Sequence, residues 1–294
     1  MKRIIAVMLI ICSIVLLFSC SKEEKDPVIT TLEPIDTSVT LDEKVVSTLE
    51  TDLFAVNIYS SYCEIAAYLG KEDVKEAVIP DSFLGVPVKK IGEYAFWGCK
   101  GLEKLTLPSS LIKIDRFAFE ECTDLKEVVA NEGLEIIGQS AFRNSALETI
   151  TLPSTLIIIG KQAFYRTKIS SVVIPDGVTS IPSYSFYGCS ELKSVTFGVR
   201  VNQIDESAFY NCTSLTKIVI PEVVSRIGDY AFRGCTSLQK VFIHKPTYIG
   251  ENSFYGCTKM TIYTPKNAKC ISGAKTYGYT YVICNTAEEM IGEQ

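Results

Sequence analysis

A phenylalanine recurs every 22 or 23 residues along most of this chain, and this spacing constrains the fold more than any other feature. An alanine or serine precedes each copy, and an isoleucine lies five positions before it. One unit of this length cannot bury enough apolar surface alone, so the period predicts a stack of similar coils. The recurring residues are Phe96, Phe119, Phe142, Phe164, Phe186, Phe209, Phe232 and Phe254.

Each repeat also contains a strand and a turn. Residues 102–107 place apolar side chains on one face of a short strand, and Pro108 ends it. After the isoleucine stands a turn-forming residue, such as Gly92, Asp115 or Pro182. We expect a single helical turn to carry the small residue and the phenylalanine inward.

The repeated unit, Ile-Gly-x-x-Ala-Phe-x-x-Cys-x-x-Leu-x-x-Val-x-Ile-Pro, closely resembles the BspA-like class of bacterial leucine-rich repeats over residues 74–265. The resemblance implies an α/β-type repeat solenoid of about eight repeats of 22–23 residues. It would be a right-handed coil with short parallel strands on one face and single-turn helices on the other. BspA-like proteins are associated with adhesion to host matrix proteins and to other cells, so the resemblance also implies a binding function.

The first residues predict export. Lys2 and Arg3 precede an uncharged, mostly apolar run over residues 4–18, which is typical of a signal peptide. Residues 17–20 resemble a bacterial lipobox, which implies cleavage before Cys20 and lipidation of its sulfur. An ordinary secretory signal with an incidental cysteine is the alternative. Residues 21–26 resemble the surface-export signal of Bacteroides-type lipoproteins.

The chain divides into five segments: a signal peptide at 1–19, a lipidated acidic linker at 20–52, an N-terminal cap at 53–90, the leucine-rich-repeat solenoid at 91–265, and a C-terminal cap and tail at 266–294. A hairpin is expected over 53–69, and a short helix and a closing strand over 268–283. The linker holds nine acidic and three basic residues, so the folded body is nearly neutral. This charge balance argues against nucleic acid as a partner.

The cysteines follow the repeat. Six of the eleven occupy one repeat position, which predicts a buried row of thiols rather than disulfides. Side chains projecting in parallel from neighbouring coils do not favour disulfide geometry. Cys270 and Cys284 flank the closing strand and are the best candidate pair for a disulfide. The six in the row are Cys99, Cys122, Cys189, Cys212, Cys235 and Cys257.

Catalytic constellations are missing from the sequence. His244 is the one histidine, and no nucleophile, base and stabiliser can be assembled around it. A zinc site normally uses several His or Cys ligands, and here the cysteines stand at core positions. We therefore expect neither enzyme activity nor a cofactor nor a metal.

Two surface rows are candidates for binding. The sheet-face row projects outward from the predicted strands because side chains alternate along a strand. It consists of Lys104, Thr106, Thr151, Val173, Thr196, Lys217, Val219, Lys240 and Phe242. Strand propensity alone is the alternative reason for its β-branched residues.

The aromatic row lies next to the core phenylalanines and is rich in the residue types found at binding hot spots. Shielding of neighbouring turns is the alternative role for these rings. Its members are Trp97, Tyr165, Tyr187, Tyr210 and Tyr255, with Tyr184 and Tyr230 two positions before the phenylalanine.

These observations together predict a lipoprotein anchored in the bacterial outer membrane, facing the cell surface and acting in adhesion. Its partner would be a host matrix protein or another cell-surface protein, and it would touch the membrane only through the lipid anchor. A glycan-binding lipoprotein and a structural component of the envelope are the alternatives.

Overall fold

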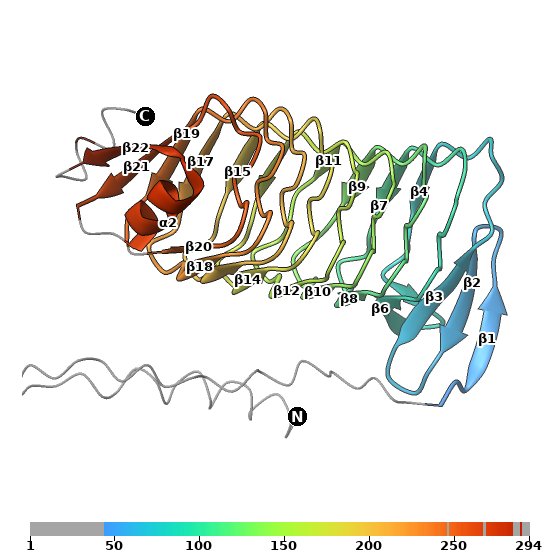
Figure 1. Ribbon diagram of the computed structural model, residues 1–294. Coiled ribbons are helices and arrows are strands. Elements are labelled where there is room, and N and C mark those ends of the chain that lie inside the picture. The colour runs from blue at the N-terminus through green and yellow to red at the C-terminus, as the bar shows by residue number, and fades with distance from the viewer. Residues whose placement is uncertain (1–43, 246, 267–268, 285–288, 290–294) are drawn as a thin grey trace, which may run out of the picture. The chain divides into compact units, whose positions relative to one another are not determined.

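The computed structural model describes residues 44–245, 247–266, 269–284 and 289. The predicted signal peptide, Cys20 and most of the predicted linker lie outside these residues. No helix in the described part of the chain is both long and apolar enough to cross a membrane. The described residues form a stack of coils with a cap at each end (Figure 1).

One side of the stack carries the main sheet, in which equivalent residues of successive coils pair in parallel register. Lys217 pairs with Lys240, for example, and Lys104 with Glu127. The sheet runs in three separate pieces, β4 to β11, β13 with β15, and β17 to β22. Its coil strands are β4 (Glu76–Val78), β7 (Lys104–Thr106), β9 (Glu127–Val129), β11 (Thr149–Ile150), β13 (Ser171–Val173), β15 (Ser194–Thr196), β17 (Lys217–Ile220), β19 (Lys240–Ile243) and β21 (Thr261–Pro265).

The predicted helices on the other side of the coils are wrong. In the described part of residues 91–257 no residue is helical, and a second ladder of two-residue parallel strands occurs instead. This ladder starts at β6 (Val86–Ile91) and is drawn along the lower side of the stack (Figure 1). It continues with β8 (Lys113–Ile114), β10 (Ile136–Ile137), β12 (Ile158–Ile159), β14 (Ser180–Ile181), β16 (Gln203–Ile204), β18 (Arg226–Ile227) and β20 (Tyr248–Ile249).

The segment around each core phenylalanine is a run of turns with left-handed residues two positions before and two after it. Tyr94 has φ 58° and Gly98 has φ 63°, and the same pattern recurs in the other coils. Left-handed residues interrupt the dihedral angles of a helix, which is why no helical turn forms. The N–H groups bond along the stack instead, with Phe96 N–H donating to Ala118 O at 2.8 Å and Gly98 N–H to Glu120 O at 2.8 Å.

The core is a column of phenylalanine rings. Neighbouring centroids lie 4.8–5.5 Å apart, and most pairs are stacked within 7° of parallel. The recurring phenylalanines, the isoleucines five positions before them and the intervening alanines are all buried. The repeat therefore places one large apolar side chain from every coil into one continuous core.

The predicted row of buried thiols is confirmed. Cys189 Sγ donates to Phe164 O at 3.0 Å, and Cys212 Sγ to Phe186 O at 3.2 Å. Each of these thiols thus bonds the carbonyl of the core phenylalanine in the preceding coil. The candidate disulfide is not formed: no S–S bond joins Cys270 to Cys284, and Cys270 Sγ lies 2.9 Å from Thr264 Oγ1 instead.

Caps cover both ends. The expected hairpin is present as β2 (Phe54–Ile58) and β3 (Cys63–Tyr68), and β1 (Ser47–Glu50) pairs with β2 from inside the predicted linker. A small hairpin, β5 (Ser82–Phe83) with β6, follows. At the other end, helix α2 (Lys269–Tyr277) leads to β22 (Thr280–Cys284), which pairs in parallel with β21.

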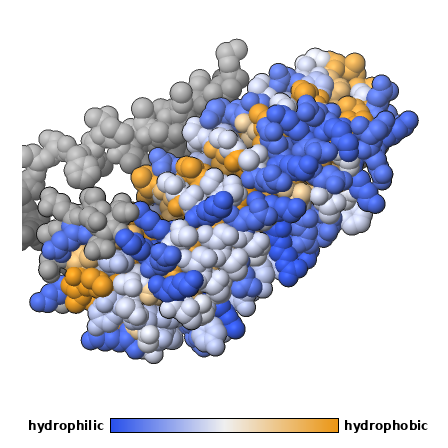
Figure 2. Space-filling model, turned by 90° about the horizontal axis from the view of Figure 1, so that it is seen from above, coloured by the Kyte–Doolittle hydropathy of each residue, from blue (hydrophilic) through white to orange (hydrophobic). Residues whose placement is uncertain are grey.

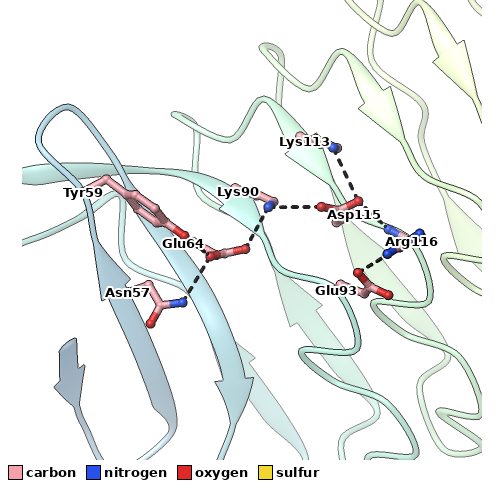
Figure 3. Close-up of polar contacts among 8 residues, drawn as sticks. All are labelled: Asn57, Tyr59, Glu64, Lys90, Glu93, Lys113, Asp115 and Arg116. Carbon is pink, nitrogen blue, oxygen red and sulfur yellow. Dashed lines mark hydrogen bonds and ion pairs between the residues drawn. The ribbon is translucent and has the colours of Figure 1, made fainter. Parts of the chain in front are cut away.

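A network of charged residues joins the N-terminal cap to the first coils (Figure 3). Glu64 in β3 is only 7% exposed. Its carboxylate accepts a hydrogen bond from the Tyr59 hydroxyl at 2.7 Å and pairs with Lys90 Nζ at 2.9 Å. Lys90 also pairs with Asp115 at 3.1 Å, and Lys113 reaches Asp115 at 3.4 Å. The buried charges are therefore compensated across three neighbouring strands, β3, β6 and β8.

Candidate functional site: an opening in the main sheet

The main sheet opens between β15 and β17. At neighbouring positions the coils are joined by bonds such as Lys193 N–H to Ser170 O at 2.9 Å and Gln239 N–H to Thr216 O at 2.8 Å. Within the described residues, no such bond links Thr216 to Lys193, and β15 does not pair with β17. The facing edges of these two strands therefore present backbone groups that no neighbouring coil satisfies.

The opening is confined to one side of the stack. On the second ladder β16 pairs with β18 in register, and Gly188 N–H donates to Tyr210 O at 2.7 Å in the turn ladder. The same two coils are thus hydrogen-bonded to each other in the second ladder and in the turns, but not in the main sheet. The result is a groove on the main sheet face rather than a gap through the molecule.

A second interruption affects both ladders, and in the second ladder it has a simple chemical cause. Between β11 and β13, and between β12 and β14, the strands also fail to pair. Gly160 N–H donates to Ile137 O at 2.8 Å and Asp205 N–H to Ile181 O at 2.9 Å. Pro182 stands at the equivalent position between them and has no N–H to donate.

The groove beside β15 and β17 has a volume of about 780 Å³. Phe197 lines it and stands where neighbouring repeats have Ile174 and Ile220, and its ring packs edge-on against Phe209 at 5.9 Å. The apolar lining is Val195, Phe197, Val199, Val219, Ile220, Pro221 and Val223. Val199 and Val223 are unusually exposed for valines, at 68% and 49%.

The polar lining of the groove combines two lysines with the hydroxyl groups of Ser194, Thr196 and Thr216. Lys193 and Lys217 belong to it, and Lys217 Nζ lies 5.6 Å from the centre of the Phe242 ring. Glu222 also lines the groove, but it pairs with Lys245 at 3.0 Å, which lowers the pKa of Glu222. An apolar groove with lysines at its rim suits a ligand that combines apolar and acidic groups.

The groove brings together three members of the predicted sheet-face row, Thr196, Lys217 and Val219. Among the others, Lys104 is ion-paired with Glu127 at 2.9 Å, and Thr106 is half-buried on the same strand. Thr151 and Val173 are exposed on the middle coils, and Lys240 lies 6.0 Å from the centre of the Tyr263 ring.

Phe242 does not belong to an accessible surface. It is 0% exposed and packs with Cys284, Val219 and Tyr263, so its assignment to the sheet-face row is wrong. The sequence pattern placed it on the outward face correctly but could not show that the C-terminal cap, through Cys284, packs against it.

The aromatic row forms a stack in which the rings cover one another. Tyr165 and Tyr187 lie 4.8 Å apart, and Tyr187 and Tyr210 lie 4.6 Å apart, all within 10° of parallel. Arg143 and Arg233 lie over the outer faces of the stack, 5.5 Å from Tyr165 and 5.7 Å from Tyr210. A sugar that binds by stacking needs a free ring face, and these three rings offer mainly their edges.

The remaining aromatic residues are more scattered. Arg233 also lies over Tyr230 and Tyr255, at 5.5 and 4.9 Å. The Tyr184 hydroxyl donates to Glu206 Oε1 at 2.9 Å. Trp97 and Tyr255 are each 58% exposed, but they lie at opposite ends of the row. The geometry therefore favours shielding over recognition for this row.

Seen from above, hydrophobic residues lie in separate patches among hydrophilic ones (Figure 2). In the described part of the chain, no group of three or more His, Cys, Asp or Glu residues is placed to hold a metal ion. In the described part of the chain, the groove combines a hollow, an apolar lining and unpaired backbone groups.

Parallel ladders around a column of phenylalanines define a leucine-rich-repeat solenoid, a fold whose proteins are typically non-enzymatic scaffolds that mediate protein interactions. Residues 50–166 and 157–281 match the family described as BspA type Leucine rich repeat region, with six copies, and the chain belongs to this family. The fold implied by the repeat is confirmed, apart from the helices.

The following two are among the solved structures that are similar to the chain. The leucine-rich repeat protein of T. pallidum has a TM-score of 0.53 and 24% identity, over 82% of this chain and 100% of that one. A leucine-rich repeat protein from Bacteroides ovatus has a TM-score of 0.43 and 22% identity, over 74% of this chain and 70% of that one. Among curated proteins, none shows significant similarity to this chain.

Proposed function

We propose that the chain is a surface-anchored lipoprotein that binds a protein partner through its main sheet face, with the groove between β15 and β17 as the anchoring point. The observation that carries the proposal is the opening of the ladder above an apolar hollow. Strand edges with unpaired N–H and C=O groups are the part of a sheet that an extended peptide segment can bond.

The lining indicates the chemistry of the partner. Val199 and Val223 offer apolar contacts, and Lys193 and Lys217 offer two positive charges at the rim. An extended segment that carries an apolar side chain next to an acidic one complements this arrangement. Host matrix proteins and other cell-surface proteins are the partners that an adhesion role would require.

Anchoring would come from lipidation of Cys20, which holds the solenoid at the bacterial outer membrane on an acidic tether. Support for this part comes from the charged and apolar start of the chain and from the sequence around Cys20. The family is generally one of surface and interaction modules, which is consistent with it.

The test is solid-phase binding of the mature chain to a panel of host matrix proteins and mucin-type glycans, in moderate salt. We expect saturable binding to a protein, resistant to soluble sugars, because the tyrosine faces are covered. Competition by sugars would establish the glycan alternative instead. Absence of binding together with a stoichiometric partner crosslinked on whole cells would point to the structural envelope role.

A further inference from the structure

We propose that Cys99 and Cys122 are a redox pair that closes to a disulfide between the first two coils when the exported chain meets an oxidising environment. Their sulfurs lie 3.0 Å apart, and the Cys99 thiol donates a hydrogen bond to the Cys122 sulfur. The two cysteines occupy equivalent positions of neighbouring coils, each five residues before one of the paired strands β7 and β9. Adjacent strands are about 4.8 Å apart, a separation that a disulfide spans.

Cys99 differs from the other thiols of the row because of the N-terminal cap. Cys122 Sγ donates to Phe96 O at 2.9 Å, and Cys257 Sγ donates to Phe232 O at 3.1 Å, each one coil back. The coil before Cys99 is replaced by the cap, where Tyr68 stacks on Phe96 at 5.0 Å. The thiol of Cys99 therefore has no phenylalanine carbonyl to bond and points at the sulfur of Cys122 instead.

The two cysteines differ in accessibility, which sets the order of the chemistry. Cys99 is 8% exposed and Cys122 is 0% exposed, and burial raises the pKa of the Cys122 thiol. Cys99 would lose its proton and attack a disulfide oxidant, such as a thiol–disulfide oxidoreductase or oxidised glutathione, and release one oxidant thiol. Cys122 then loses its proton and attacks the mixed disulfide at Cys99, and the second oxidant thiol leaves. Two thiols are oxidised to one disulfide, and one oxidant disulfide is reduced to two thiols.

A bond here would fasten the first repeat to the second directly beneath the cap. End repeats have only one neighbouring coil and therefore open most readily. A crosslink at this place restricts the unfolded chain and holds the end of the stack closed. The proposal is independent of the binding function.

The experiment equilibrates the mature chain with a buffer of reduced and oxidised glutathione, alkylates the remaining thiols in acid, and digests with trypsin without reduction. Peptides 91–100 and 117–126 each contain one of the two cysteines. We expect these peptides linked, with the loss of two hydrogens, while the peptides holding Cys212 and Cys235 are alkylated. Recovery of Cys99 and Cys122 as alkylated peptides at every ratio of the buffer would overturn the proposal.

A second measurement, of stability against denaturant, tests whether the disulfide itself stabilises the fold. The oxidised chain should unfold at higher denaturant concentration than the reduced chain, and Cys99→Ser should abolish this difference. Cys212→Ser, at an equivalent position of the row, should keep it. If the oxidised and reduced forms of Cys99→Ser still differ in stability, the stabilising disulfide involves other cysteines. If Cys99→Ser does not fold, the peptide map of the wild type alone tests whether Cys99 and Cys122 are linked.

Discussion

At the residue scale, the turn around each phenylalanine depends on two left-handed positions. The position two after the phenylalanine carries glycine in Gly98, Gly188, Gly234 and Gly256, and asparagine in Asn144 and Asn211. These are the residues that adopt positive φ most readily, so this half of the pattern could have been found in the sequence. Glu121 and Arg166 obscure it. The position two before the phenylalanine carries tyrosine, phenylalanine, serine or glutamine in every coil except that of Asn252, and these residue types give no such signal.

Gly98→Ala tests this conformation. The added Cβ would meet nothing within 4 Å, so the substitution isolates the cost of a left-handed alanine. We expect the free energy of unfolding to fall by about 1 kcal/mol. Urea denaturation measures the change, with the exposed neighbour Lys100→Ala as the control. Equal stability of Gly98→Ala and the wild type would contradict the turn geometry.

Tyr187→Ala tests the role of the aromatic row. Tyr187 stacks on Tyr165 and Tyr210 and also contacts the tilted ring of Tyr184, so its loss removes three ring contacts. We expect a loss of about 1–2 kcal/mol in stability and an affinity for a confirmed partner that is unchanged within about twofold. A large loss of affinity with unchanged stability would show that the aromatic row binds the partner.

At the element scale, the length of each strand and the regularity of its pattern decided which elements could be predicted from the sequence. The strands of the main sheet, the terminal helix and the phenylalanine column follow from local alternation and from a strict period, and both are visible in the sequence. The second ladder was missed because two-residue strands are too short to produce a pattern. The groove was missed because its strands consist of ordinary strand-forming residues. The one departure in the sequence is Phe197-Gly198, which stands where the repeats before and after it have Ile-Pro.

Hydrogen exchange tests the opening between β15 and β17. The amide of Thr216 has no acceptor in the neighbouring coil, whereas the equivalent amide of Gln239 donates to Thr216 O at 2.8 Å. We expect the peptide that contains Thr216 to exchange faster than the one that contains Gln239, because unpaired amides exchange without opening of the structure. Equal protection of the two segments would mean that the sheet is continuous there.

The charged network at the cap predicts a dependence on pH. Burial alone would raise the pKa of Asp115, but the Arg116 backbone N–H and the Lys113 and Lys90 ammonium groups lower it below its usual value. A lowered carboxyl pKa stabilises the fold above the unfolded value, about 3.9, and this contribution is lost as pH falls through the folded pKa.

We therefore expect Asp115→Asn to lose about 2 kcal/mol of stability at neutral pH, because a charged hydrogen-bond partner of Lys90 is removed. Denaturation curves of the two proteins from pH 7 to pH 2 should converge in acid. A constant difference between them across this range would show that Asp115 acts through packing rather than charge.

At the scale of the whole molecule, the proposed anchor makes the chain a tethered module. Cys20→Ala should abolish incorporation of labelled palmitate and move the protein from the membrane to the soluble fraction. Protease added to intact cells should digest the wild-type solenoid if it faces outward. Complete protection of the chain in intact cells would place the anchor on the inner leaflet.

The most direct test of the proposed binding surface is the affinity of two matched variants for the protein partner found on the panel. Val199→Glu places a carboxylate in the groove, and Val78→Glu places one on the first strand of the same sheet, at positions that are 68% and 65% exposed in the wild type. We expect Val199→Glu to weaken binding by about tenfold or more and Val78→Glu to leave it unchanged, with both proteins as stable as the wild type. Equal affinities for the two variants would contradict the groove as the anchoring point.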